Sequence, residues 1–344
     1  MFNVNFTDIK NILQDYNITN KFISFSELQR FHYERVDQQS KQVRLIVKID
    51  FEDSASVVMR FKNETDVNIE LIEKQSQFAD VLKTNGIAVP AQYKTNGHFA
   101  RWYSIGGYDV IVTIEDFVDN EVKIVDTAIA KATGKMLAKT HMISEHNDFH
   151  IDNAVLFNPF TQNDLFAYYD FSSMESFLSG QDKIIFDKIT NKYNSYMELL
   201  TPLKNRTKYA VQGDISENNL FVTKSGEIGL FDFNRAGDNI LFCDAVMQAV
   251  FYARLMDYPE NVSEDYKNQI LSAFWDGYCS VREFTTEEQQ MYPYLYAIIN
   301  AFWSMDIIWD ENSLINAHKS GNSKIVSKCL ATIWERLSCI VPMP

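Results

Sequence analysis

The pattern of apolar residues changes near residue 118, and this change constrains the fold more than any other feature of the chain. Before it, short apolar runs are separated by polar turns, which is typical of antiparallel strands. After it, apolar residues recur mostly every three or four positions, which is typical of helices. The sequence therefore predicts an α+β protein with two lobes, a β-rich lobe over residues 1–118 and a mostly helical lobe over residues 119–344.

The first lobe is expected to hold five strands and one main helix after a short opening helix. QVRLIVKIDF and SVVMRF flank the turn EDSA, so they predict an antiparallel hairpin. KFISFSEL, HFARWYSI and YDVIVTIEDF supply three further strands. The helix follows SVVMRF, with Val67, Leu71, Phe78, Val81 and Leu82 mostly on one face, and TNGIAVP ends it.

Composition narrows the class of protein. Cys243, Cys279, Cys329 and Cys339 are scattered without metal-ligand spacing, so we expect neither a disulfide framework nor a zinc site. The net charge of −14 disfavours nucleic acid and anionic membrane surfaces as partners. No apolar run is long enough to span a membrane, and the first residues do not resemble an export signal. We therefore expect a cytoplasmic protein.

One stretch, VQGDISENNLFVTKSGEIGLFDFNRAGDNILFCDA, concentrates polar residues at the ends of short apolar runs. Asp214 is followed by Asn219, Asp232 and Asp244. Phosphoryl transfer needs a positioned nucleophile, metal ions on the phosphates and positive charge near them. A carboxylate can accept the proton of an acceptor hydroxyl, while an amide and a second carboxylate are oxygen ligands that suit magnesium. Asp214, Asn219 and Asp232 supply that set.

QGDISENNLF followed by GLFDF resembles the aminoglycoside-phosphotransferase-like branch of the protein-kinase-like family, which includes choline and homoserine kinases. The resemblance implies a two-lobed protein-kinase-like fold that binds ATP and Mg²⁺. It also implies that Asp214 is the catalytic base, that Asn219 and Asp232 are metal ligands, and that Asp244 braces the catalytic loop from the next helix.

The first lobe shares this resemblance. SVVMRF is similar to the strand whose basic residue binds the nucleotide phosphates, which places Arg60 there. Lys62 is the alternative, because residues two apart on a strand share a face. Glu73 stands where the acidic partner of that cation is expected, and Glu70 is the alternative.

YDVIVTIEDF resembles the strand that enters the hinge between the lobes, so main-chain groups near Thr113 and Glu115 are expected to bind the adenine. GKMLAKTHMIS resembles the family helix that ends in L-A-x-x-H, where His141 is expected to be a structural hydrogen-bonding residue.

Three features depart from the family pattern. Gln212 replaces the histidine before Gly-Asp, and it is expected to support the catalytic loop by bonding to backbone. Residues 27–41, where a phosphate-covering loop is expected, contain no glycine. Arg60 replaces a lysine, and a planar guanidinium differs from a point charge. These departures leave two alternatives open: GTP as the nucleotide, and a catalytically inactive nucleotide-binding protein.

The acceptor is expected to bind on the helical lobe, as in the family. Trp303, Asp306 and Asp310 are spaced three and four apart, so they are expected to share one helix face. An aromatic and acidic face suits a cationic amine. The sequence thus predicts a kinase that phosphorylates a hydroxyl of a small molecule, with an aminoglycoside or another amine-bearing alcohol as the candidate acceptor. A protein kinase is disfavoured, because only 11 residues separate Asp232 from Asp244.

Overall fold

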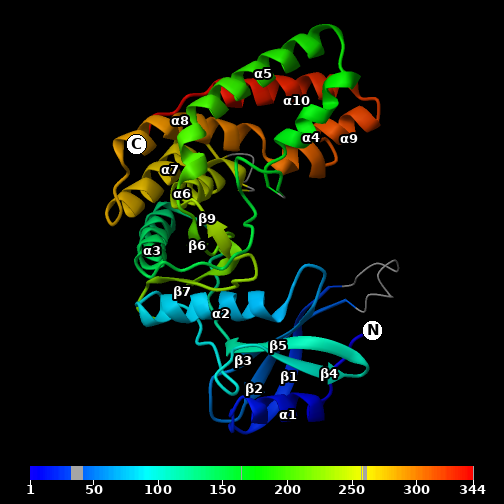
Figure 1. The fold of residues 1–344 in the computed structure, drawn as a ribbon, viewed down its shortest axis with the longest axis vertical. Helices are drawn as coiled ribbons and strands as arrows, with labels where there is room; N and C mark the ends of the chain where they lie inside the picture. The colour runs from blue at the N-terminus through cyan, green and yellow to red at the C-terminus, as the bar shows by residue number, and fades with distance from the viewer. Residues whose placement is uncertain (32–41, 164, 257, 259–261, 344) are drawn as a thin grey trace. The chain divides into compact units, whose positions relative to one another are not determined.

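The computed structural model describes residues 1–31, 42–163, 165–256, 258 and 262–343, and the chain forms two compact units (Figure 1). The first unit comprises Met1–Val122, Ile151–Asn153 and Glu217–Asn234. The second unit comprises Lys123–His150, Ala154–Ser216 and Arg235–Pro344. The first unit is rich in strands and the second is mostly helical, which confirms the predicted α+β class.

A five-stranded antiparallel sheet forms the centre of the first unit, in the order β1-β2-β3-β5-β4. Its strands are β1 (Phe22–Arg30), β2 (Val43–Phe51), β3 (Val57–Asn63), β4 (Arg101–Ile105) and β5 (Tyr108–Asp116). The predicted hairpin between β2 and β3 is confirmed, because Val43 lies opposite Asn63 and Ile49 opposite Val57. Residues 32–41 of the expected phosphate-covering loop lie outside the described part of the chain.

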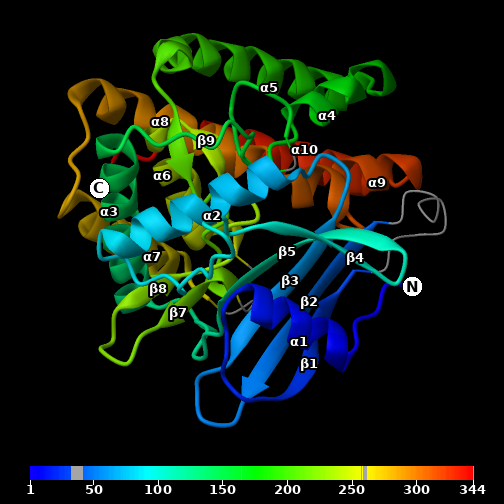
Figure 2. The same ribbon diagram turned by 60° about the horizontal axis from the view of Figure 1, so that its bottom comes forward.

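Two helices pack on opposite faces of this sheet, α1 (Phe6–Asp15) on one and α2 (Ile69–Thr84) on the other (Figures 1 and 2). Asn5 caps α1 by accepting from the backbone N–H groups of Thr7 and Asp8. Met59 and Phe61 belong to the buried core on the α1 side. Because successive side chains on a strand point to opposite faces, Arg60 and Lys62 lie on the other face.

A small hairpin completes the first unit, although its residues come from the later part of the chain. It consists of the short helix η4 (Glu217–Asn219) and the paired strands β7 (Leu220–Val222) and β8 (Ile228–Leu230). The N–H of Leu230 donates to the carbonyl of Ala88 at 2.8 Å, and the N–H of Val122 donates to the carbonyl of Leu220 at 2.9 Å. These bonds hold the hairpin to the segment after α2 and to the chain after β5.

The second unit consists mainly of helices around a short strand pair, β6 (Tyr209–Val211) and β9 (Gly237–Asn239). Its longer helices are α3 (Thr127–His146), α5 (Gly180–Leu199), α6 (Leu241–Val250), α7 (Glu264–Cys279), α8 (Thr286–Ala301) and α10 (Ser323–Ser338). Its shorter elements are α4 (Tyr168–Ser173), η2 (Met174–Phe177), η3 (Thr201–Asn205), η5 (Phe251–Leu255), η6 (Met305–Trp309) and α9 (Leu314–Lys319). Among the described residues, none of these helices is both long and apolar enough to cross a bilayer.

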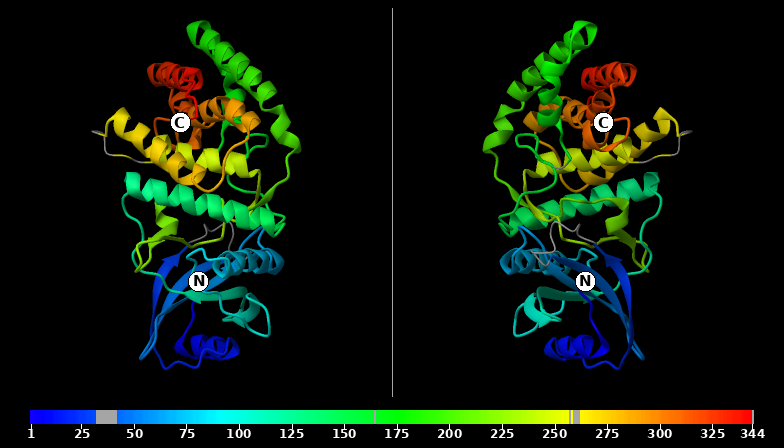
Figure 3. Two further views of the ribbon diagram at one scale, coloured as in Figure 1. Left: turned by 90° about the vertical axis from the view of Figure 1, so that its left-hand side faces the viewer. Right: turned by 90° about the vertical axis from the view of Figure 1, so that its right-hand side faces the viewer.

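Helices α3 and α7 lie side by side and approach closely at two glycines (Figure 3). A Cβ atom added to Gly134 would overlap the backbone carbonyl oxygen of Phe274. A Cβ atom added to Gly277 would overlap the carbonyl oxygen of Lys131. The two backbones can approach this closely only because neither glycine carries a side chain.

Candidate active site

Arg60 lies on the α2 face of the sheet and is held there by Glu115. Its Nε and Nη2 atoms donate to Oε1 of Glu115 at 3.0 and 2.7 Å. Glu115 is only 8% exposed, and its Oε2 accepts a bond from Nε2 of Gln92 at 2.8 Å. Both carboxylate oxygens are therefore used, which fixes the orientation of the guanidinium.

The third guanidinium nitrogen, Nη1, does not bond to Glu115. Nη1 of Arg60 is buried, has no hydrogen bond, and lies 3.6 Å from Oδ2 of Asp232. Burial by itself would lower the pKa of Arg60, but the Glu115 and Asp232 carboxylates outweigh it and raise that pKa above its ordinary value. The structure therefore holds a permanently charged donor, with one nitrogen unbonded, next to the carboxylate predicted to bind metal.

Lys62, the alternative phosphate ligand, contacts the segment that follows Asp232, at Asn234. Its Nζ donates to Oδ1 of Asn234 at 3.2 Å and lies 3.5 Å from a carboxylate oxygen of Glu64. Nε2 of Gln75 on α2 donates to the carbonyl of Asn234 at 3.1 Å. Burial lowers the pKa of Lys62, and the nearby Arg44 adds to this effect. Lys62 thus positions the segment after Asp232, and Arg60 lies closer to Asp232 itself.

Glu73 does not pair with either cation, contrary to the sequence expectation. Its Oε2 accepts from the backbone N–H groups of Phe99 and Ala100 at 2.8 and 2.9 Å. Glu70, the alternative, is exposed in the first turn of α2. The partner of Arg60 comes from strand β5, because Glu115 lies on the same sheet face as Arg60 and one strand away.

The N–H and carbonyl groups of Thr113 and Glu115 bond within the sheet, so an adenine that binds near these residues would use neighbouring main-chain groups. Thr113 pairs with Arg60 and Glu115 with Val58 across β3. On the other edge, the carbonyl of Ile114 accepts from Tyr93 N–H, and the N–H of Asp116 donates to Ala91, each at 2.9 Å.

Main-chain groups without a hydrogen-bond partner lie at the last residue of β5 and just beyond it. Within the part of the chain that the structure describes, the carbonyl of Asp116 and the N–H and carbonyl groups of Val118 and Asp119 have no hydrogen-bond partner. An adenine that bonds to the main chain at this end of the sheet would therefore meet these groups.

Asn219 and Asp232, the predicted metal ligands, lie at the same end of the β7–β8 hairpin. Asn219 directly precedes β7, Asp232 follows β8 by two residues, and the N–H of Phe231 donates to the carbonyl of Asn219 at 3.0 Å. Asp232 has a φ of 56°, in the left-handed region that few residues other than glycine adopt. Six other Asn and Asp residues among those described also have a positive φ, so this conformation does not by itself mark a site.

Asp214, the predicted catalytic base, belongs to the second unit, where its loop is held on both sides. Oε1 of Gln212 accepts from the N–H of Asp214 at 2.8 Å, so Gln212 bonds to the loop backbone as expected. Gly213 has a φ of +79°, and a Cβ there would lie 2.8 Å from the carbonyl oxygen of Arg235. The hydroxyl of Tyr252 donates to the carbonyl of Ile215 at 2.6 Å.

Asp244 and His141 form a buried pair in the second unit. Nε2 of His141 lies 3.0 Å from Oδ2 of Asp244, and Nδ1 lies 2.9 Å from the hydroxyl of Tyr278. Burial lowers the pKa of His141, although the bond to Asp244 opposes the shift. The imidazole is fully buried and makes two hydrogen bonds, so it has the structural role expected from the sequence.

Trp303, Asp306 and Asp310 do not share one helix face, which corrects the sequence expectation. Helix α8 ends at Ala301, and the chain continues as the π-helical turn η6, after which Asp310 begins a turn. The helix stops because Trp303 pairs with Phe166 and the N–H of Ser304 donates to the carbonyl of Leu165.

Asp306 and Asp310 line one cavity, and Trp303 does not line it. They line a cavity of about 580 Å³ between η6 and α10, together with Lys328 and Arg336. Nη1 of Arg336 donates to Oδ2 of Asp306 at 2.6 Å. The charge of Asp306 is therefore already paired, and Asp310 is the acidic residue of this cavity with more capacity for a ligand.

The side chains that hold the candidate site in place were not predicted from the sequence. Gln92, Asn234 and Tyr252 have no local motif that marks them. Glu115 carried a usable signal, because a glutamate in the apolar run YDVIVTIEDF is expected to be buried and must then be paired.

The fold defined by these elements is the protein-kinase-like fold, in the form that aminoglycoside phosphotransferases and small-molecule kinases share. No family model and no curated protein matches the sequence. A microcompartment-associated aminopropanol kinase matches with a TM-score of 0.59 and 13% identity, over 96% of this chain and 100% of the other. An amicoumacin kinase matches with a TM-score of 0.57 and 13% identity, over 98% and 96%.

A third match is the complex of a phosphotransferase with gentamicin, at a TM-score of 0.51 and 11% identity, over 98% of this chain and 99% of the other. These matches confirm the predicted fold and the resemblance on which it was based. At such low identity they show the fold alone.

Proposed function

We propose that the protein is a small-molecule phosphotransferase that transfers the γ-phosphate of ATP, with GTP as the alternative nucleotide, to a hydroxyl group. The observation that carries this proposal is the buried Nη1 of Arg60, which has no hydrogen bond and lies 3.6 Å from Asp232. A buried donor without a hydrogen bond is costly unless a ligand satisfies it. The shared fold with small-molecule kinases supports the same function.

The nucleotide is bound by the first unit in this proposal. Nη1 of Arg60 donates to a phosphate oxygen, while Glu115 and Gln92 keep the guanidinium in place. The adenine bonds to main-chain groups between Asp116 and Asp119, because the groups of Thr113 and Glu115 bond within the sheet. Lys62 holds the loop after Asp232 through Asn234.

Asn219 and Asp232 would hold Mg²⁺. The donor set fits, because an amide and a carboxylate offer oxygen ligands and magnesium takes few protein ligands beside its waters and the phosphates. Both residues stand at one end of the same hairpin. When bound, the metal supplies positive charge that offsets the negative charge of the β- and γ-phosphates.

Asp214 acts as the general base. Its carboxylate accepts the proton of the acceptor hydroxyl as that oxygen forms a bond to the γ-phosphorus. The bond between the γ-phosphorus and the bridging oxygen breaks, and the nucleoside diphosphate leaves with the electron pair. Gln212 and Tyr252 position the loop by bonding to the backbone on either side of Asp214.

An amine-bearing alcohol is the acceptor that best suits this chain. The net charge of −14 favours a cationic ligand over an anionic one, and Asp310 with Asp306 offers acidic groups in a cavity of the second unit. The similar structures include an aminopropanol kinase and a gentamicin-bound phosphotransferase, and both aminopropanol and gentamicin carry amines and hydroxyls.

The test is thermal unfolding with and without ATP or GTP plus magnesium, on the wild type and on Asp232→Asn. Ligand at a hundred times its Kd stabilises by about 2.7 kcal/mol, which raises Tm by several degrees. We expect a shift in the wild type that the variant loses, followed by nucleotide turnover when aminopropanol or gentamicin is added. A shift without turnover would favour the inactive nucleotide-binding alternative, and no shift with either nucleotide would overturn the proposal.

A further inference from the structure

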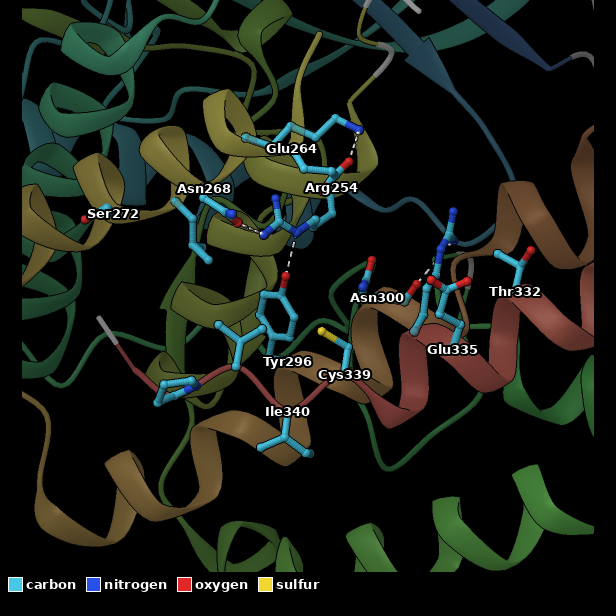
Figure 4. A pocket seen from close by; sticks show the side chains of 15 residues that line it. Arg254, Glu264, Asn268, Ser272, Tyr296, Asn300, Thr332, Glu335, Cys339 and Ile340 are labelled. Carbon is cyan, nitrogen blue, oxygen red and sulfur yellow. Dashed lines mark hydrogen bonds and ion pairs between the residues drawn. The ribbon is translucent and has the colours of Figure 1, made fainter.

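A cavity of about 720 Å³ lies within the second unit, between α7, α8, the C-terminal end of α10 and the segment that follows it. Its polar lining includes Arg254, Asn268, Tyr296, Asn300, Glu335 and Arg336 (Figure 4). The volume is in the range of about 300–1,000 Å³ that is usual for small-molecule sites. None of the residues assigned to phosphoryl transfer lines it.

Arg254 reaches this cavity from the turn η5 and is held in one orientation. Nε donates to the hydroxyl of Tyr296 at 2.6 Å, and Nη1 donates to the carbonyl of Ala253 at 3.1 Å. Nη2 donates to Oδ1 of Asn268. Figure 4 shows the bonds to Tyr296 and Asn268 converging on the guanidinium from two sides.

All three hydrogen-bond partners of Arg254 are neutral, so none of them pairs with its charge. Within the described residues, no carboxylate lies within ion-pair distance of this half-buried guanidinium. The other two cations of the cavity differ, since Arg336 pairs with Asp306 at 2.6 Å and Lys267 with Glu264 at 3.0 Å. A partly buried charge without a counter-ion is costly, and an anion removes that cost.

The guanidinium also has donors left for such an anion. Arginine carries five N–H groups, and three of those of Arg254 are used. The two that remain are on Nη1 and Nη2, one on each, so they can bind two oxygens of a carboxylate or phosphate in parallel. The bonds to Tyr296 and Asn268 already order the side chain. Binding of an anion therefore loses less conformational entropy, which favours it.

The turn η5 that carries Arg254 is π-helical, and this is an independent reason to expect a ligand. It continues α6 from Phe251 to Leu255 with the wider π-helical hydrogen bonding. Isolated π-helical turns of this kind are rare and are frequent at functional sites.

We propose that this cavity binds a small anionic molecule whose carboxylate or phosphate is held by Arg254. The site is additional to the proposed phosphotransferase site and does not require it. In a chain with a net charge of −14, a small anion needs a local uncompensated cation such as this one to bind.

The test is calorimetric titration of the full chain at low ionic strength, without nucleotide or magnesium. Succinate probes the carboxylate and glycerol phosphate probes the phosphate, while succinamide and glycerol are their neutral counterparts. The variants are Arg254→Gln, which removes the charge, and Arg254→Lys, which keeps the charge without the planar fork. Lys224→Gln makes the same charge change on an exposed residue of the first unit and is the matched control.

We expect at least one anion to bind at least tenfold more tightly than its neutral counterpart, and the preferred anion identifies the ligand class. Arg254→Gln should weaken that binding at least tenfold, Arg254→Lys less, and Lys224→Gln less than twofold. Thermal unfolding of each variant checks that it is folded. The proposal is overturned if neither anion is preferred to its neutral counterpart, or if Arg254→Gln folds and binds as the wild type does. Because no nucleotide is present, either result is independent of the phosphotransferase proposal.

Discussion

Arg60 on β3 is held by Glu115 on the neighbouring strand β5, through two hydrogen bonds of 3.0 and 2.7 Å to one carboxylate oxygen. The sheet itself therefore orients the proposed phosphate-binding cation. Glu73 on α2, where the sequence led us to expect this partner, instead binds the backbone N–H groups of Phe99 and Ala100. It follows that the orientation of the guanidinium depends on the sheet and not on a side chain of α2.

The first prediction compares the two glutamates. Glu115→Gln removes the negative charge that orients Arg60, and a charge-assisted hydrogen bond contributes about 1.5–3 kcal/mol. We therefore expect nucleotide affinity to fall by about tenfold to a hundredfold, measured by titration with ATP and magnesium. Glu73→Gln is the matched control, and its effect on affinity should be no more than about threefold. Equal losses in both variants would show that Glu115 has no greater part than Glu73 in positioning the cation.

The second prediction separates nucleotide binding from chemistry. Asp214→Asn keeps the size of the side chain but removes the proton acceptor, so turnover should fall by about a hundredfold to ten-thousandfold. The nucleotide-dependent rise in Tm should stay within a degree of the wild-type value, because the proposed nucleotide ligands lie elsewhere in the chain. Turnover at the wild-type rate would remove Asp214 from the role of base.

The third prediction concerns the contact between α3 and α7. Gly134→Ala introduces a Cβ that overlaps the carbonyl oxygen of Phe274, so the two helices must separate. We expect a loss of about 3 kcal/mol or more in the free energy of unfolding, measured in urea, or a failure to fold. Lys135→Ala on the exposed side of α3 should change stability by less than about 0.5 kcal/mol. A small effect of Gly134→Ala would mean that the helices are not in close contact.

The fourth prediction is a pH dependence that originates at His141. Burial lowers the pKa of this imidazole below its ordinary value of 6.5, so at moderately acidic pH the unfolded chain binds a proton that the folded chain does not. Stability is therefore fully present above about pH 6.5 and falls as the pH drops below it, by at most about 1.4 kcal/mol per pH unit from this group.

The measurement is urea unfolding at several pH values between about 7.5 and 5.5, on the wild type and on His141→Gln. Glutamine can still bond to Asp244 and Tyr278 but does not titrate in this range. The variant should lose stability less steeply below pH 6.5 than the wild type does. Parallel slopes in the two proteins would place the titrating group elsewhere.

Local patterns were sufficient for the predicted fold. Short apolar runs identified β2, β3 and β5, and the polar turn EDSA identified the hairpin between β2 and β3. Both signals depend only on residues that are neighbours in the sequence. The same applies to α2 and α3. The loop around Asp214 was identified by residue types at fixed spacing, and Gln212 bonds to its backbone as expected.

Local patterns failed where a contact joins distant parts of the chain. The sequence predicted one helix through Trp303, Asp306 and Asp310, and the spacing fits such a helix. The helix ends at Ala301 because the chain near Trp303 forms backbone contacts with residues about 140 positions earlier, namely Leu165 and Phe166. No window of neighbouring residues contains that information.

The sequence by itself determined the α+β class, the order of the main elements and the residue types of the candidate site, because these depend on periodicity and spacing along the chain. Only the tertiary structure decided that Glu115 and not Glu73 holds Arg60, that the main chain of Thr113 and Glu115 bonds within the sheet, and that Arg254 has no ion-pair partner among the described residues. Each of these depends on which donors and acceptors remain after distant segments have paired, and that is settled only when the chain has folded.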